Sequence, residues 1–121
     1  FLSRNQQDDI LFNLAQKGVT PNTRFMIGPE TFTWHINEDN PYTLSTVKRM
    51  KMFVDEHPNT DFILGAVTMK RYQTRNAPTS TAKKGRGYWY DTFNASVHMD
   101  TSGKCEFFHK SKLVVLAEFI P

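Results

Sequence analysis

Apolar residues near the N-terminus repeat with the spacing of a helix. Ile10, Leu11 and Leu14 fall on one face of a helix that we predict over residues 5–16. Gly18 follows two residues later and suits the C-terminal end of a helix, where the backbone often turns left-handed. The first element of the fold is therefore predicted to be a helix whose apolar face carries these three side chains.

A short apolar run follows this helix. Residues 25–27 end in Gly28-Pro29, which is typical of a buried strand that stops at the proline, because proline cannot donate to a sheet ladder. Glu30 comes directly after the proline, so we expect its carboxylate at the C-terminal end of a strand. Residues 35–42 are polar and contain Asn-Glu-Asp-Asn-Pro, a composition that predicts a loop.

A second helix and a second buried strand come next. Thr43 or Ser45 can cap a helix that runs to about Asp55, and His57-Pro58 ends it. Residues 62–69 are mainly apolar and predict a buried strand. The succession of helix, strand, helix and strand favours the α/β fold class.

The rest of the chain combines a long loop with a hairpin. Residues 71–87 are rich in Thr, Ser, Asn, Gly and basic residues and predict a long exposed loop. Residues 90–99 alternate between apolar and polar positions, as a half-buried strand does. Residues 100–103, Asp-Thr-Ser-Gly, have the composition of a turn, and residues 104–110 return as the second strand of the hairpin.

Composition predicts one folded domain. Hydrophobic residues make up 39% of the 121 residues, which is sufficient for one packed core. The formal net charge is +3, and the cations between Lys70 and Arg86 are not interrupted by an acid, which indicates an anionic partner such as nucleic acid or a lipid headgroup.

Cys105 is the one cysteine, so a disulfide framework and a Cys-rich metal site are excluded. The four histidines lack ligand spacing, and no metal or other cofactor is predicted.

Three segments share the residue types and the order of a catalytic constellation. They are Gly28-Pro29-Glu30-Thr31; then Tyr90-Asp91-Thr92-Phe93-Asn94-Ala95-Ser96 with the turn Asp100-Thr101-Ser102-Gly103 and Phe108-His109-Lys110; and Lys112-Leu113-Val114 running into Glu118-Phe119-Ile120-Pro121. Together they resemble the nitrilase (carbon–nitrogen hydrolase) superfamily, and most closely its apolipoprotein N-acyltransferase branch. Val115-Leu116-Ala117 stands where that branch has Pro-Phe-Gly.

The resemblance implies a fold and a set of roles. The fold would be part of a nitrilase-type α-β-β-α sandwich. Glu30 would be the base that activates a thiol, Lys110 would stabilise the oxyanion, and Glu118 would hold the lysine and the substrate in position. Taken alone, Glu30 and Lys110 would each be assigned to the solvated surface, and it is their occurrence together in the family's order that favours a site.

The same resemblance places the nucleophile elsewhere. The family's Cys would fall after Pro121, and Cys105 lies before Lys110 on a predicted strand, so it cannot replace that Cys. Residues 1–121 would then be the N-terminal and central part of the catalytic domain, inactive without the part that bears the nucleophile. An incomplete sandwich exposes sheet edges or apolar faces, so we expect this chain to form dimers or larger species.

The function implied is the transfer of a fatty acyl chain from a phospholipid, through a Cys thioester, to the N-terminal cysteine amine of apolipoproteins. The partners would be the phospholipid, the apolipoprotein and a membrane surface, with the domain on the periplasmic side of the cell inner membrane. One alternative is a soluble amidase of the same superfamily. The other is a nucleic-acid-binding module, for which the basic loop beside Tyr88, Trp89 and Tyr90 has suitable residues. No RNA-binding signature is present, so nucleic acid is not the predicted partner.

Overall fold

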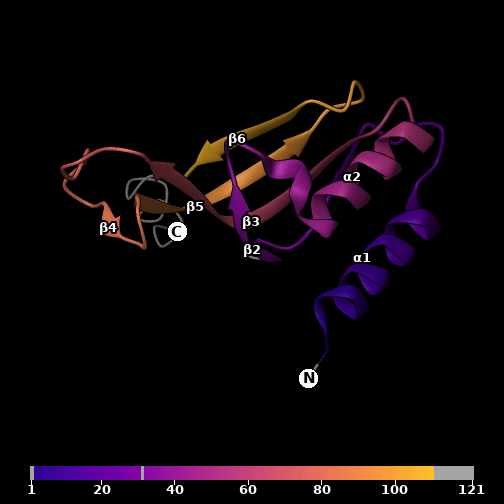
Figure 1. Cartoon of the computed structure of the whole chain (residues 1–121). Coiled ribbons are helices and arrows are strands. Elements are labelled where there is room, and N and C mark those ends of the chain that lie inside the picture. Colours follow the sequence, from indigo (N-terminus) through magenta and orange to yellow (C-terminus); the bar gives the residue numbers. More distant parts are fainter. Residues whose placement is uncertain (1, 31, 111–121) are drawn as a thin grey trace, which may run out of the picture.

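Two helices and a six-stranded mixed sheet form the fold, which confirms the α/β class (Figure 1). The computed structural model describes residues 2–30 and 32–110, with the backbone alone for residues 34 and 35. In chain order the elements are α1 (Arg4–Gly18), β1 (Phe25–Ile27), β2 (Thr33–Asn37), the short 3-10 helix η1 (Pro41–Thr43), α2 (Ser45–Glu56), β3 (Asp61–Tyr72), β4 (Lys83–Lys84), β5 (Trp89–Met99) and β6 (Cys105–His109).

Helix α1 begins with a capping box and buries a different face from the predicted one. The Ser3 side chain accepts from the backbone of Gln6, whose own side chain accepts from the Ser3 amide. The buried residues are Asp8, Phe12 and Ala15, whereas Ile10 and Leu14 are exposed. The predicted packing face was therefore wrong for Ile10 and Leu14, whereas Leu11 is partly buried and packs against the core.

Helix α2 explains why Asp8 is buried. Neither Thr43 nor Ser45 caps this helix, because its N-cap is Leu44, which makes no capping side-chain bond. The hydroxyls of Thr46 and Ser45 instead donate to the Asp8 carboxylate, at 2.8 and 3.3 Å. The carboxylate thus reaches the N-terminal end of α2, where negative charge is favoured by the helix dipole.

The central pair of the sheet is the long antiparallel ladder of β3 and β5, which pairs Phe62 with Met99 and continues to Tyr72 with Trp89. β1 and β2 both run parallel to β3 along its other edge, and β4 and β6 both pair with the outer edge of β5. The strand predicted over residues 62–69, the alternation over 90–99 and the hairpin return over 104–110 are confirmed.

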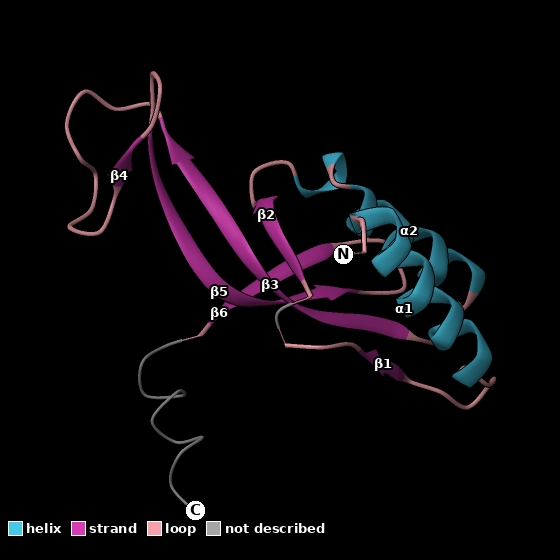
Figure 2. Ribbon diagram, turned by 90° about the horizontal axis from the view of Figure 1, so that it is seen from below, coloured by secondary structure: helices cyan, strands magenta, loops and turns pink. Residues whose placement is uncertain are grey.

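The two helices cover one face of the sheet (Figure 2). The core lies between them, and Phe62 of β3 packs against Phe12 of α1 and Phe53 of α2 with ring centroids 5.2 and 5.1 Å apart. The register places Phe25, Ile27 and Phe108 on the opposite face, where their side chains are exposed. We call this opposite side the open face, because no described helix covers it.

Two predictions for the segment between α1 and α2 need correction. The strand over residues 25–27 exists, but it is an edge strand with Phe25 and Ile27 exposed rather than buried. Residues 35–42 are not all loop, because β2 extends to Asn37 and buries Ile36 against the core. Pairing with the end of β3 imposes a strand on a segment whose own composition favours a turn.

The loop predicted over residues 71–87 is shorter and more ordered than its sequence suggests. β3 continues to Tyr72, and the two residues of β4 pair with Tyr90 and Trp89 of β5. The end of the β3–β5 hairpin extends past β2, away from both helices (Figures 1 and 2). We call residues 70–90 of this projection the hairpin tip.

Candidate functional site

Glu30 lies in a short bulge between β1 and β2, three residues after β1 ends, as expected for a strand's C-terminal end. The bulge is attached to β3 at Gly65, whose amide donates to Pro29 O and whose carbonyl accepts from the Phe32 amide, both at 2.9 Å. A side chain at position 65 would place its Cβ 1.3 Å from the Glu30 carbonyl oxygen. The absence of a side chain at Gly65 therefore sets where Glu30 lies.

Lys110 follows the end of β6. Its amide donates to Asn94 O at 2.8 Å, which extends the β5–β6 pairing by one bond. The Lys110 Nζ lies 3.6 Å from Glu30 Oε1. The structure thus brings together Glu30 and Lys110, which the motifs predicted as the base and the oxyanion stabiliser.

The strand register explains how residues so far apart in the sequence meet. Gly65, Ser96 and Phe108 occupy one row across β3, β5 and β6, so their side-chain positions share the open face. The Glu30 main chain lies against Gly65 on this face, and Lys110, two residues beyond Phe108, presents its side chain to the same face and reaches Glu30 across it. The pair is therefore a consequence of the sheet and not of a local turn.

The environment of the pair differs from the expected one. The Glu30 side chain is 76% exposed and that of Lys110 is 24% exposed. A general base is expected at a partly desolvated position, whereas the described residues leave the Glu30 carboxylate open to solvent. At 3.6 Å the two groups attract each other as charges, but the distance is longer than a normal hydrogen bond.

The other residues of the predicted constellation are placed as follows. Glu118, the Val115-Leu116-Ala117 segment and Thr31 lie outside the described residues. Cys105 packs against the core from β6, and burial raises the pKa of its thiol to about 11. A thiol with this pKa is almost entirely protonated at neutral pH, which is unfavourable for a nucleophile.

The hairpin tip presents to solvent the basic residues that lie between positions 70 and 86. Its six cations are exposed, namely Lys70, Arg71, Arg75, Lys83, Lys84 and Arg86. The Arg71 guanidinium lies 4.8 Å from the Tyr88 ring centroid, and Lys84 Nζ lies 5.7 Å from that of Trp89. The tip therefore combines cations with aromatic rings, as the sequence predicted for residues 70–90.

Asp91 organises the hairpin tip, a role that was not predicted from the sequence. Its carboxylate is 4% exposed and accepts from the hydroxyls of Tyr72, Thr79 and Thr81 at 3.1, 2.8 and 2.7 Å. Burial disfavours the charged form, but the three hydroxyl donors and a nearby lysine outweigh it, so the pKa of Asp91 lies below its usual value. A signal was present, because Asp91 occupies an inward position of the alternating strand with Phe93.

A second polar contact that the sequence did not indicate, partly buried, joins three strands. Glu38, next to β2, accepts from the Thr68 hydroxyl of β3 and lies 2.5 Å from His109 Nε2 of β6. The His109 ring stacks on Phe93 with centroids 3.8 Å apart. One carboxylate oxygen thus contacts both partners and ties the end of β2 to β3 and β6.

Other features of the described chain lie away from the pair. Within residues 2–30 and 32–110, no group of three or more His, Cys, Asp or Glu side chains is placed to hold a metal ion. Neither described helix is long and apolar enough to cross a membrane. Two surface pockets are described, one where α1 and α2 end and one beside Tyr42 and Lys51, and neither is lined by Glu30 or Lys110.

Comparison with known proteins gives no family assignment. No protein-family model matches the chain, and no match is found among the curated proteins or the solved structures. The resemblance to the nitrilase superfamily therefore stays a prediction from the motifs.

Proposed function

We propose that this chain is part of an apolipoprotein N-acyltransferase-like catalytic domain, in which Glu30 is the base and Lys110 stabilises the oxyanion. The observation that supports this most directly is the 3.6 Å approach of Lys110 Nζ to Glu30 Oε1. The motifs predicted the pair from the order of residues alone, with no local sequence reason for the two side chains to meet.

The proposed reaction has two steps. A Cys thiolate supplied beyond Pro121 attacks a phospholipid ester after Glu30 removes the thiol proton, and Lys110 stabilises the oxyanion that forms. As this intermediate collapses, the ester C–O bond breaks, the lysophospholipid leaves with the proton that Glu30 returns to its oxygen, and a thioester remains. The N-terminal cysteine amine of an apolipoprotein then attacks the thioester, Glu30 takes a proton from the amine and returns it to the sulfur, and the C–S bond breaks to release the thiol. Glu118 is proposed to hold the lysine and the substrate in position.

The proposed domain is a nitrilase-type α-β-β-α sandwich of which the described sheet and helices are one half. The open face supports this arrangement, because it carries apolar side chains suited to a second sheet. The proposed location is the periplasmic side of the cell inner membrane.

The test uses the protein encoded together with its continuation after Pro121. Purified protein is incubated with an alkyne-labelled phospholipid and a diacylated cysteinyl peptide, and the thioester and the N-acylated peptide are followed by mass spectrometry. We expect Glu30→Gln and Lys110→Met each to reduce transfer by roughly 10²–10³-fold.

A matched pair on the same hairpin provides the control. Lys104 Nζ and Glu106 Oε1 lie 3.1 Å apart and are exposed, so Lys104→Met and Glu106→Gln should leave transfer unchanged. Transfer that survives Glu30→Gln contradicts the assigned base. Hydrolysis of small amides without acyl transfer would favour the alternative, a soluble amidase of the superfamily.

The hairpin tip is proposed to contact the membrane surface. Its exposed cations favour anionic headgroups, and its Trp and Tyr residues suit the interface. We expect Lys83→Ala with Lys84→Ala to weaken flotation with anionic vesicles, and Lys48→Ala with Lys51→Ala on α2 to have less effect. Binding of a single-stranded oligonucleotide at low salt, with no vesicle binding, would favour the nucleic-acid alternative instead.

A further inference from the structure

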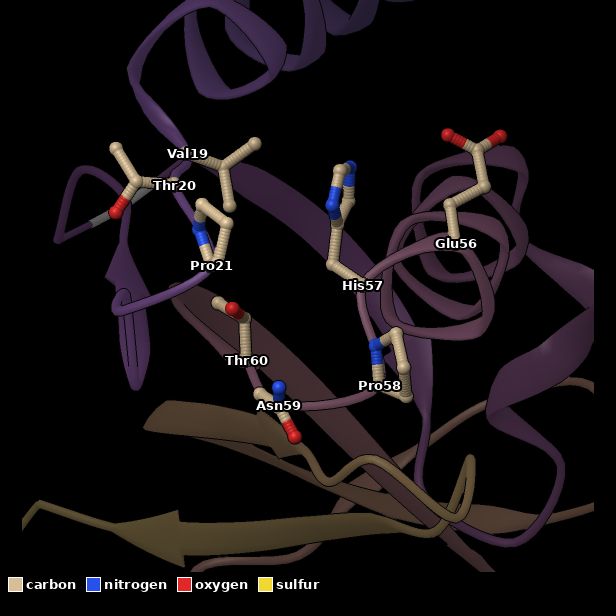
Figure 3. Close-up of a pocket in the computed structure, with 8 residues that line it drawn as sticks. All are labelled: Val19, Thr20, Pro21, Glu56, His57, Pro58, Asn59 and Thr60. Atoms are coloured by element: carbon tan, nitrogen blue, oxygen red, sulfur yellow. The ribbon is translucent and has the colours of Figure 1, made fainter.

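A pocket of about 360 Å³ lies where the two helices end. Figure 3 shows the segment after α1 on one side, the end of α2 on the other, and Asn59 and Thr60 between them. It is lined by Val19, Thr20, Pro21, Glu56, His57, Pro58, Asn59 and Thr60. The pocket lies before the start of β3 and is thus separate from Glu30, which packs against the middle of that strand.

Gln16 of α1 contacts the two polar side chains at one edge of the pocket, Glu56 and His57. Its amide nitrogen lies 2.9 Å from Glu56 Oε2, and its amide oxygen lies 2.8 Å from His57 Nε2. Because a carboxylate only accepts, the amide nitrogen must face Glu56 and the amide oxygen must face His57. Neutral His57 therefore carries its proton on Nε2, which leaves Nδ1 as a lone-pair acceptor that no described residue engages.

The hydroxyls of the pocket are already hydrogen-bonded within the protein. Thr60 donates to Thr23 O at 2.6 Å, and the Thr20 and Thr23 hydroxyls pair with each other at 3.2 Å. The pocket thus offers a ligand the Glu56 carboxylate and His57 Nδ1 as acceptors, and the Asn59 side-chain amide, which carries both a donor and an acceptor, lies below them.

Both helices add negative potential to the same region. α1 ends at Gly18 and α2 at Glu56, so the carbonyl ends of the two helix dipoles meet at the pocket. Val19, Pro21 and Pro58 provide apolar walls beside these acceptors. An acceptor-rich edge at two helix C-termini, next to apolar walls, is complementary to a cation that carries N–H donors on a short alkyl chain.

We propose that this pocket binds a primary alkylammonium group, such as a lysine-like side chain or a small aliphatic amine. The ammonium lies against Glu56 and His57, and the alkyl chain lies against Val19, Pro21 and Pro58. The site is independent of the proposed acyl transfer.

The test is a titration of the protein with n-butylammonium chloride at constant ionic strength, followed by ¹H–¹⁵N NMR. We expect saturable shifts in the millimolar range at residues 19–21 and 56–60, and no saturable shifts there with n-butanol or sodium butyrate. Glu56→Gln should weaken butylammonium binding by roughly two- to fivefold, the range for a solvent-accessible ion pair.

Asp55→Asn is the matched control, because Asp55 is adjacent on α2 but pairs with Lys51 and lines the other pocket. It should leave the affinity unchanged. Thermal unfolding of each variant confirms that it is folded before titration. Equal binding of n-butanol, an equal effect of Asp55→Asn, or no effect of Glu56→Gln would overturn the proposal.

Discussion

Replacement of Gly65 by alanine tests the geometry on which the Glu30–Lys110 pair depends. The new Cβ would lie 1.3 Å from the Glu30 carbonyl oxygen and 2.0 Å from its carbonyl carbon, whereas Cβ contacts below 3.0 Å essentially do not occur. Gly65 does not have positive φ, so the conflict is one of space and not of backbone conformation. The main chain at Glu30 must move away from β3.

The expected cost follows from what this movement breaks. Two backbone hydrogen bonds, from Gly65 N to Pro29 O and from Phe32 N to Gly65 O, hold the bulge to β3. Their loss contributes roughly 1–3 kcal/mol, and the overpacking adds about 1–3 kcal/mol. We therefore expect Gly65→Ala to lower the free energy of unfolding by about 2–6 kcal/mol.

Urea denaturation measures this loss, and hydrogen exchange locates it. The amides of Gly65 and Phe32 should lose protection in the folded variant. Gly18→Ala is the control, because a Cβ at this last residue of α1 meets nothing within 4 Å; it should be neutral or stabilising by up to about 1 kcal/mol. If Gly65→Ala unfolds like the control and keeps both amides protected, Glu30 does not lie where the structure places it.

The remaining predictions concern buried polar groups and the open face. Asp8→Ala should lower the free energy of unfolding by about 1–3 kcal/mol, because the Thr46 hydroxyl loses its acceptor, and urea denaturation measures this. The depressed pKa of Asp91 stabilises the fold above the unfolded-state value of 3.8, and this contribution is lost as pH falls through the folded pKa; unfolding curves recorded from pH 5 downward should therefore lose part of their pH dependence in Asp91→Asn. With a thiol pKa of about 11 against 9.0, Cys105 should react with iodoacetamide at pH 8 roughly a hundredfold more slowly in the folded than in the unfolded protein, and equal rates would contradict its burial. Because of the open face, light scattering at high concentration should show dimers or larger species, and a monomer would refute this expectation.

The sequence predicted best the strands whose two faces differ in environment. In β5 the inward residues Ala95, Val97 and Met99 are buried and alternate with polar positions. This alternation of apolar and polar residues predicts a strand without any knowledge of the tertiary structure. β2 was missed for the opposite reason. Its segment is short and polar, and it becomes a strand because β3 offers an unpaired edge beside Thr33 and Ile36.

The face of α1 was predicted wrongly because hydrophobicity alone does not say which stripe meets the sheet. Ile10 and Leu14 form one plausible stripe, but the helix turns inward through Phe12 and Ala15. Asp8 lies on this inner stripe and is tolerated there because hydroxyls from α2 satisfy its carboxylate. The hydroxyls that donate to Asp8 lie in another helix, and the partner within α1, Arg4, is 4.0 Å away and four residues earlier, a spacing equally typical of an exposed ion pair.

For the candidate site too, the sequence predicted which residues lie together but not how far they are exposed to solvent. The order of motifs predicted that Glu30 and Lys110 belong together, and the row of Gly65, Ser96 and Phe108 gives the physical reason that they meet. Desolvation could not be predicted in this way, because it depends on what lies over the open face.

A carboxylate that removes a thiol proton is expected to act in a site from which water is excluded, and the Glu30 side chain is 76% exposed among the described residues. Under the proposed function, the layer that covers the open face would both complete the core and remove water from Glu30. The ammonium of Lys110 would then lower the free-energy cost of burying the Glu30 carboxylate, and the same ammonium would stabilise the oxyanion when it forms. Under the proposed function, completion of the fold and activation of the base would therefore be a single requirement, and the described residues would position the pair before a covering layer makes it reactive.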